Sequence, residues 1–260
     1  MNKELDELEE KFRNRPLEKV YPVLWADALY ENIRGDKRVV KKAVMVVKAI
    51  NMDGKREIIA IHPMLEESKE TYSVLFNSLK ERGLEKVHLV ISDAHKGLKA
   101  AVEECFIGAS WQRCKVHFMR NILARIPQKQ KEIVGAKLKV IWQAATKKEA
   151  EVLKNAFVEE YEKRFPEAIK CLEEGFEDSV QFYAFDKIDP KKISSSNALE
   201  RVNEEIRRRT KVVGIFPSDK SYIRLVTTYL IEYTENWLEG SCYVKADLLK
   251  QQIEDLAKAA

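Results

Sequence analysis

The sequence predicts an α/β fold whose strands and helices follow the order βββαβαβ and lead into a long helical segment. Three strand-like runs open the chain, and two more alternate with amphipathic helices between residues 68 and 116. From His117 to about Gly175 the apolar spacing is helical throughout. These observations indicate a mixed sheet with flanking helices and an all-helical insertion.

The composition is that of a globular protein. The chain has 260 residues, of which 45% are hydrophobic and 34% charged, so it can bury a core of its own. No apolar run approaches the roughly 18 residues of a membrane span, and residues 1–16 are too charged for a secretion signal. We therefore expect a cytoplasmic protein without membrane contact. We expect no disulfides, because the cysteines are widely scattered: Cys105, Cys114, Cys171 and Cys242.

The first part of the chain predicts one helix and three strands. A charged helix over Lys3–Phe12 ends before Pro16, which steers the preceding residue out of the helical region. Two hairpin signals, Arg34-Gly35-Asp36-Lys37 and Asp53-Gly54, separate the strands that follow. These strands are Tyr21–Tyr30, Val39–Ile50 and Glu57–Ile61.

Helix and strand signals alternate next. Ser68 is a suitable N-cap for a helix that Gly83 ends. This first helix has one apolar face, formed by Tyr72, Leu75, Phe76 and Leu79, and a strand over Val87–Ser92 follows it. A second helix, with an apolar face of Leu98, Ala101, Val102 and Cys105, then leads to a strand around Trp111–Val116.

The second half of the chain is helical. A capping box over Thr146–Glu149 and a proline, Pro166, mark helix starts in the insertion. Two long helices follow, from about Asn197 to Thr210 and from Ser218 to Trp237, and the tail after Gly240 has amphipathic spacing. The second of these helices places on one face Tyr222, Leu225, Val226, Tyr229 and Tyr233.

Asp27 interrupts a strand that is otherwise apolar. An ionised carboxylate buried in such a sheet costs several kcal/mol unless a cation or hydrogen-bond donors compensate it. A metal ligand meets this requirement, and so does an aspartate that makes a turn hydrogen bond at the strand end.

Asp93 directly follows the strand Val87–Ser92. Open α/β sheets bind their ligands at the carboxyl ends of the strands, which favours a functional role. An aspartate between a strand and a helix is also a common N-cap, so both interpretations stay open.

Glu200 lies three residues after Asn197, so it could be the partner in a capping box. However, the buried stripe of this helix is Leu199, Val202 and Ile206. Glu200 then lies on another face, which it shares with Asn203 or Glu204, Arg207 and Arg208. The carboxylate and the cations then share one surface.

The three acids together suit a metal site. Asp27 and Asp93 are expected at the ends of adjacent strands, since the fourth strand of a βββαβ order can pair beside the first. Two strand-end aspartates and a helical glutamate supply the oxygen ligands that Mg²⁺ or Mn²⁺ prefers. Two such ions about 3.5–4 Å apart activate a water or a 3′-hydroxyl and stabilise the leaving oxygen in phosphodiester chemistry.

Four sequence motifs resemble successive motifs of Mutator-type transposases of bacterial insertion sequences, which have a ribonuclease H-like catalytic domain with a DDE triad. The resemblance extends from about Phe12 to Trp237. The motifs are YPVLWADALY at Tyr21–Tyr30, ISDAHKG at Ile91–Gly97, WQRCKVH at Trp111–His117 and NALER at Asn197–Arg201.

The resemblance implies that Asp27, Asp93 and Glu200 are the catalytic DDE residues and ligands of two Mg²⁺ or Mn²⁺ ions. It implies hydrolysis of DNA at the ends of an element, followed by transfer of 3′-hydroxyls into a target. The partner is then double-stranded DNA, both element ends and target, and we expect a homodimer on that DNA.

The same resemblance divides the chain into segments. They are an N-terminal helix (1–17), the first part of the ribonuclease H-like core (18–117), a helical insertion (118–192), helices that complete the catalytic domain (193–240) and a helical tail (241–260). Full-length members carry an N-terminal DNA-binding region, whereas only about twenty residues precede Tyr21 here. The alternative is therefore a truncated or domesticated nuclease or DNA-binding protein without transposition activity.

Four further residues are expected near the acidic cluster. Cys114 and His117 form a Cys-x-x-His pair, which is half of a tetrahedral zinc site. No other cysteine or histidine pair has complementary spacing, so we favour a structural role beside the active site over zinc. His95 and Asn197 are placed there because each lies close in sequence to one of the acids.

The net charge of +4 does not by itself indicate a polyanionic partner, because 46 Lys and Arg nearly balance 42 Asp and Glu. Local clusters do. We expect phosphate contacts of low sequence preference from cations near the fifth strand and along the Glu200 helix. These are Arg113, Lys115, Arg120, Arg201, Arg207, Arg208, Arg209 and Lys211.

Overall fold

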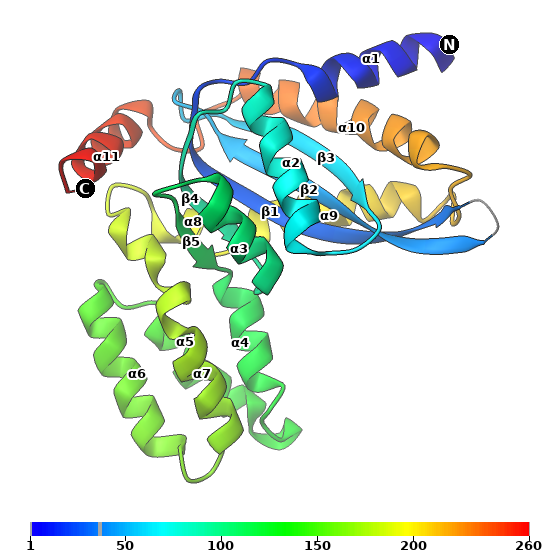
Figure 1. Ribbon diagram of the computed structural model, residues 1–260. Helices are drawn as coiled ribbons and strands as arrows, with labels where there is room; N and C mark the ends of the chain where they lie inside the picture. The colour runs from blue at the N-terminus through cyan, green and yellow to red at the C-terminus, as the bar shows by residue number, and fades with distance from the viewer. Residues whose placement is uncertain (1, 36–37, 260) are drawn as a thin grey trace.

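The computed structural model of the chain describes residues 2–35 and 38–259. At its centre is a five-stranded sheet in the order β3-β2-β1-β4-β5 (Figure 1). β2 is antiparallel to β1 and β3, whereas β1, β4 and β5 run parallel. The strands are β1 (Val20–Arg34), β2 (Val39–Ile50), β3 (Arg56–Met64), β4 (Lys86–Ser92) and β5 (Ser110–Arg113). Along the chain, α2 lies between β3 and β4, and α3 lies between β4 and β5, so the predicted order βββαβαβ is confirmed.

β1 is longer than the sequence predicts. It pairs with β2 as far as Arg34 opposite Val39, but its pairing with β4 stops at Ala26 opposite Ser92. Half of β1 therefore extends past the end of its parallel neighbour. In the predicted first hairpin, positions 36–37 lie outside the described residues. The second hairpin is confirmed, with Gly54 at a φ of 74° that favours glycine.

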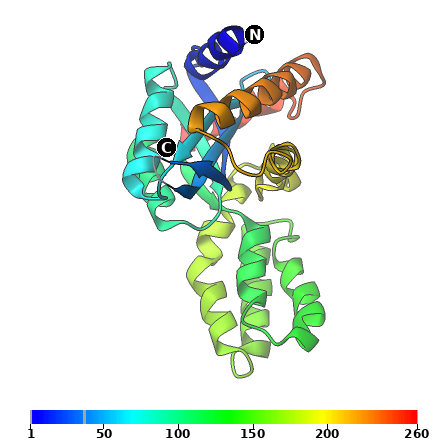
Figure 2. The ribbon, with the colours of Figure 1, turned by 90° about the vertical axis from the view of Figure 1, so that its right-hand side faces the viewer.

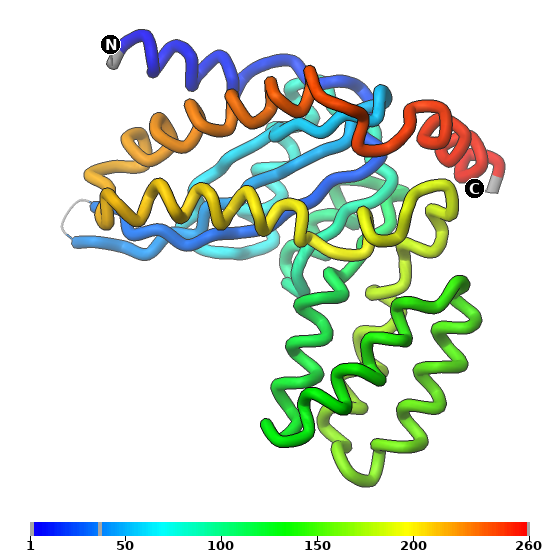
Figure 3. Tube along the Cα trace, turned by 180° about the vertical axis from the view of Figure 1, so that it is seen from behind, coloured from blue at the N-terminus to red at the C-terminus, as the bar shows by residue number. Residues whose placement is uncertain are grey.

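Helices cover both faces of the sheet. On one face lie α2 (Lys69–Glu81) and α3 (Lys96–Cys105), with Ser68 capping α2 as predicted. On the other lie α1 (Asn2–Asn14), α9 (Asn197–Thr210) and α10 (Asp219–Glu239), seen side by side in Figure 3. The alternation of β1 explains this arrangement, because Leu24 and Ala26 belong to the core under α2 and α3, and Val23 and Trp25 to the opposite core.

One prediction for α10 is wrong. Leu225, expected on its buried face, is 40% exposed, whereas Ile223 and Leu230 are buried. α10 contacts β3, α1 and α9, so its buried surface is wider than a single stripe and turned away from Leu225.

The helical insertion projects away from the sheet (Figure 2). Its helices are α4 (Lys115–Leu123), α5 (Lys131–Ile141), α6 (Lys147–Tyr161) and α7 (Pro166–Ser179), with single turns at Gln128–Gln130 and Gln181–Ala184. Thr146 caps α6 and Pro166 begins α7, as predicted.

The expected strand around Trp111–Val116 is too long. β5 ends at Arg113, the amide of Cys114 donates to Ser92 O at 2.8 Å, and α4 begins at Lys115. The helix is favoured because Phe118 and Ile122 are buried in the core of the insertion.

Two more helices complete the chain. α8 (Pro190–Ile193) connects the insertion to α9, and α11 (Ala246–Ala259) forms the predicted amphipathic tail. Among the described residues, no helix combines the length and the apolar character needed to cross a membrane. The four cysteines are free.

Candidate active site

Asp27 and Asp93 lie on adjacent parallel strands, as the sequence predicts. Asp27 follows Ala26 in β1, Asp93 follows Ser92 at the end of β4, and Ala26 and Ser92 are register partners. One part of the expectation is wrong, because Asp27 is not at a strand end. β1 continues to Arg34 by pairing with β2 alone, so Asp27 occupies the first position beyond the β4 pairing. That position opens the β4 side of Asp27 to a ligand.

α9 brings two polar side chains to this edge. Asn203 is buried and its Nδ2 donates to Asp27 Oδ2 at 2.8 Å. Glu200 lies three residues earlier, on the same side of the helix. The sequence placed Asn203 on the same helix face as Glu200, but it gave no sign of the hydrogen bond to Asp27.

His117 joins Asp93 to Glu200. Its Nδ1 contacts Asp93 Oδ1, and its Nε2 lies 3.3 Å from Glu200 Oε1. Arg120, one turn further along α4, has a guanidinium nitrogen 4.0 Å from Glu200 Oε2. The three predicted acids thus converge around one imidazole, and we call Asp27, Asp93 and Glu200 the carboxylate cluster.

The alternative roles considered for Asp93 and Glu200 do not match the helix ends. His95, not Asp93, occupies the N-cap of α3, and it makes no side-chain cap hydrogen bond. The N-cap of α9 is Ser196, whose backbone N–H donates to Cys114 Sγ. Glu200 is therefore no capping-box partner of Asn197, which is the first residue of the helix.

The electrostatics of the site show an excess of negative charge. Burial, followed by repulsion from Asp93, raises the pKa of Asp27 to about 6. The hydrogen bond with Asp93, and then that with Cys114, raises the pKa of His117 to about 10. At neutral pH a positively charged imidazole therefore lies against the carboxylates and partly compensates them.

A small cavity opens beside the aspartates. It has a volume of about 230 Å³ and is lined by Asp27, Asp93, Glu67, Tyr72 and His95, among other residues. The His95 ring packs edge-on against Tyr72, with the ring centres 5.4 Å apart. His95 is thus near the cluster, as expected.

Asn197 lies elsewhere. It lines a different cavity of about 370 Å³ together with Arg56, Lys192 and Arg201. Among the described residues, no contact joins its side chain to the carboxylate cluster. Asn197 is the first residue of α9 and its side chain is exposed, so the expected place beside the cluster is wrong.

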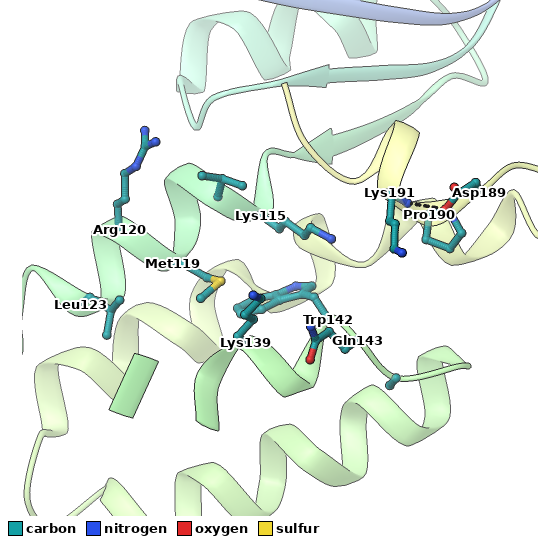
Figure 4. A pocket seen from close by; sticks show the side chains of 12 residues that line it. Lys115, Met119, Arg120, Leu123, Lys139, Trp142, Gln143, Asp189, Pro190 and Lys191 are labelled. Atoms are coloured by element: carbon teal, nitrogen blue, oxygen red, sulfur yellow. Dashed lines mark hydrogen bonds between the residues drawn. The ribbon is translucent and has the colours of Figure 1, made fainter. Parts of the chain in front are cut away.

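The largest described pocket adjoins the cluster through Arg120. It has a volume of about 830 Å³, and Figure 4 shows Lys115 and Lys191 extending into the space beside Trp142. Its cations are Lys115, Arg120, Lys139 and Lys191, and its apolar lining includes Val116, Met119, Leu123 and Trp142. We call this the basic pocket. Lys139 and Lys191 were missed because α5 and α8 approach α4 only in the folded chain.

The other predicted cations differ in their surroundings. Arg113 is half-buried, with its guanidinium 4.0 Å from the centre of the Phe118 ring. Arg208 and Arg209 both pair with Glu205 on their own helix. Arg201, Arg207 and Lys211 are exposed. Arg120, on the helix that carries His117, lies 4.0 Å from Glu200, and Arg113 is close enough to Asp93 to interact with it electrostatically.

Comparisons with known proteins relate the chain to transposases. The family model described as "Transposase, Mutator family" matches residues 1–240. The chain is 38% identical over 251 residues to a protein from Rhizobium meliloti, "Transposase for insertion sequence element ISRM5", covering 96% of this chain and 63% of the relative. It is 38% identical to the transposase for insertion sequence element IS256 in transposon Tn4001 from Staphylococcus aureus, covering 93% and 62%.

A third relative, the transposase for insertion sequence element IS1081 from Mycobacterium tuberculosis, is 37% identical over 96% of this chain and 60% of its own length. The chain thus spans less than two thirds of the length of these relatives. Among solved structures, the chain matches the Drosophila P element transposase strand transfer complex with 11% sequence identity and a TM-score of 0.31. The match covers 96% of this chain and 73% of that one. Because the family model matches residues 1–240, the chain belongs to the Mutator family of transposases.

Proposed function

We propose that the chain is the catalytic core of an insertion-sequence transposase. It hydrolyses DNA phosphodiesters at the element ends and transfers the resulting 3′-hydroxyls into target DNA. The observation that carries the proposal is the convergence of Asp27, Asp93 and Glu200 around His117. The relatives, which are transposases of insertion sequences, support it.

We also propose a ribonuclease H-like topology for the core. The strand order β3-β2-β1-β4-β5, with β2 as the one antiparallel strand among those described, supports this assignment. The insertion then lies between β5 and α9, and α9 returns to β1 to deliver Glu200.

The carboxylate cluster fits Mg²⁺ or Mn²⁺. Its ligand atoms are all carboxylate oxygens, which these ions prefer. A cation would offset the burial and the repulsion from Asp93 that together raise the pKa of Asp27. Bound there, two ions would activate the attacking water or 3′-hydroxyl and stabilise the leaving oxygen. Asn203 orients Asp27, and His117 holds Asp93 and Glu200 in place.

The basic pocket supports DNA as the partner. Lys115, Lys139 and Lys191 form no ion pair with a described carboxylate, so their ammonium groups are available to phosphates. Arg120 connects this pocket to Glu200. A DNA strand held there passes beside the carboxylate cluster.

Replacing Lys115, Lys139 and Lys191 with alanine is expected to weaken binding to unrelated duplexes alike. In a plot of log affinity against log salt concentration, each lost phosphate contact should also make the slope less steep by about 0.9. Fluorescence anisotropy over a range of salt concentrations measures both. The matched control replaces Lys19, Lys69 and Lys147, each of which pairs with a glutamate on the surface. Equal loss of affinity in both variants would show that only net charge matters.

A cleavage and joining assay tests the proposed activity. The substrate is a labelled duplex taken from the DNA that flanks the coding sequence, and the target is a supercoiled plasmid in Mg²⁺ buffer. Cleavage followed by joining of the label to the plasmid is the expected result. Cleavage without joining would favour a nuclease, and binding without cleavage would favour a DNA-binding protein.

A further inference from the structure

Cys114 belongs to a second set of metal-binding donors beside the carboxylate cluster. Its Sγ, a carboxylate oxygen of Asp93 and an imidazole nitrogen of His117 all lie within 4.8 Å of one another. A thiolate, an imidazole and a carboxylate are the ligands that Zn²⁺ takes in tetrahedral sites. Three protein ligands leave the fourth position open to water.

The surroundings of Cys114 suit a metal-bound thiolate. The side chain is fully buried, and its sulfur accepts hydrogen bonds from the N–H and the hydroxyl of Ser196, at 3.4 and 3.2 Å. Cys114 also directly precedes α4, and the first turn of a helix carries partial positive charge. These donors can hydrogen-bond a sulfur that a metal ion holds. Thiolate is a ligand for Zn²⁺, whereas Mg²⁺ prefers oxygen.

Sequence spacing alone showed half of this site. Cys114 and His117 lie three residues apart across the start of α4, so the helix brings them together. Asp93 completes the set because the amide of Cys114 is bonded to Ser92 O, which brings the start of α4 to the end of β4. No spacing rule for cysteines and histidines includes an aspartate from another strand.

We propose that Zn²⁺ binds Asp93, Cys114 and His117 and thereby inhibits the Mg²⁺-dependent reaction. The inhibition rests on the proposed function, since Asp93 belongs to both donor sets. An Asp93 carboxylate bound to zinc is lost to the carboxylate cluster, and a His117 imidazole bound to zinc no longer holds Glu200 in place. Zinc and the catalytic ions therefore compete, and the ligand that separates them is Cys114.

Co²⁺, which replaces Zn²⁺ and is visible in absorption spectra, tests the binding. Titrated into the whole metal-free chain, it is expected to produce a sulfur-to-cobalt charge-transfer band that added Zn²⁺ removes. The band should be lost in Cys114→Ser and in His117→Gln. It should persist in Cys242→Ser, which removes the exposed cysteine and serves as the matched control.

Ser196→Ala tests the support of the thiolate. Loss of a hydrogen bond to a metal ligand lowers metal affinity by about 10–100-fold, and a weakening of Zn²⁺ binding in this range is expected in competition with Co²⁺. A band that persists in Cys114→Ser, or one that disappears in Cys242→Ser, would overturn the site. If Cys114→Ser does not fold, as judged by circular dichroism, His117→Gln gives the same information.

The inhibition is measured separately, as the ratio of DNA cleavage rates with and without Zn²⁺ at constant Mg²⁺. We expect a ratio well below one for the parent and a ratio closer to one for Cys114→Ser. Zinc that binds without slowing the parent would overturn the inhibition. A parent that never cleaves DNA in Mg²⁺ would contradict the proposed function, while the cobalt band would still decide the metal site.

Discussion

Glu200→Gln is expected to lower Mg²⁺-dependent cleavage and joining of DNA by a factor on the order of 10²–10³, the loss typical of one preorganised electrostatic contact in an active site. Glutamine keeps the size of the side chain and an oxygen that accepts from Ser196. It removes one negative charge from the carboxylate cluster, and hard divalent ions depend on that charge. Gel assays of cleavage and joining measure the effect.

The fold and the DNA affinity of Glu200→Gln should stay close to those of the parent, because Glu200 is only half-buried and caps no helix. Glu204→Gln, an exposed acid one turn further along α9, is the matched control and should retain activity. The assignment of Glu200 is wrong if its variant cleaves DNA at the parent rate. Glu204 would then be the nearest acid to test.

Asp27→Asn is expected to make the metal-free protein more stable at about pH 8, despite removing a proposed metal ligand. The folded state raises the pKa of Asp27 from 3.8 to about 6. The parent therefore loses folding free energy as the pH rises from about 4 through 6, and it gains none back above that range. A shift of about two units corresponds to about 3 kcal/mol, and asparagine avoids this cost.

Thermal unfolding in a chelating buffer measures the difference, which should disappear below about pH 3, where Asp27 is protonated in both states. Asp53→Asn, at an exposed turn, is the control and should change little at either pH. Mg²⁺ should raise the unfolding temperature of the parent more than that of Asp27→Asn, because ligand binding stabilises only a protein that retains the site. A lower unfolding temperature for Asp27→Asn at pH 8 without metal would contradict the burial of a charged carboxylate.

The order of the strands and helices was predictable because it depends on local patterns. Period-two apolar runs predicted β1 to β4, and the stripe Leu199, Val202 and Ile206 predicted the buried face of α9 with its correct bounds. The errors fell where neighbours decide the outcome. β1 continues to Arg34 because β2 pairs with it, and Leu225 is exposed because α10 packs against β1, β3, α1 and α9 with its other sides.

The sequence by itself determined the order of strands and helices along the chain, because apolar patterns are local. From that order, in which the fourth strand can pair beside the first, Asp27 and Asp93 were expected on adjacent strands. Only the tertiary structure decided how the site is assembled. His117 joins Asp93 to Glu200, Asn203 orients Asp27, and Lys139 and Lys191 meet Lys115, all across elements far apart in the chain. The physical reason is that these contacts depend on the packing of α4, α5, α8 and α9 against one another and against the sheet, and no local propensity encodes how separate elements pack.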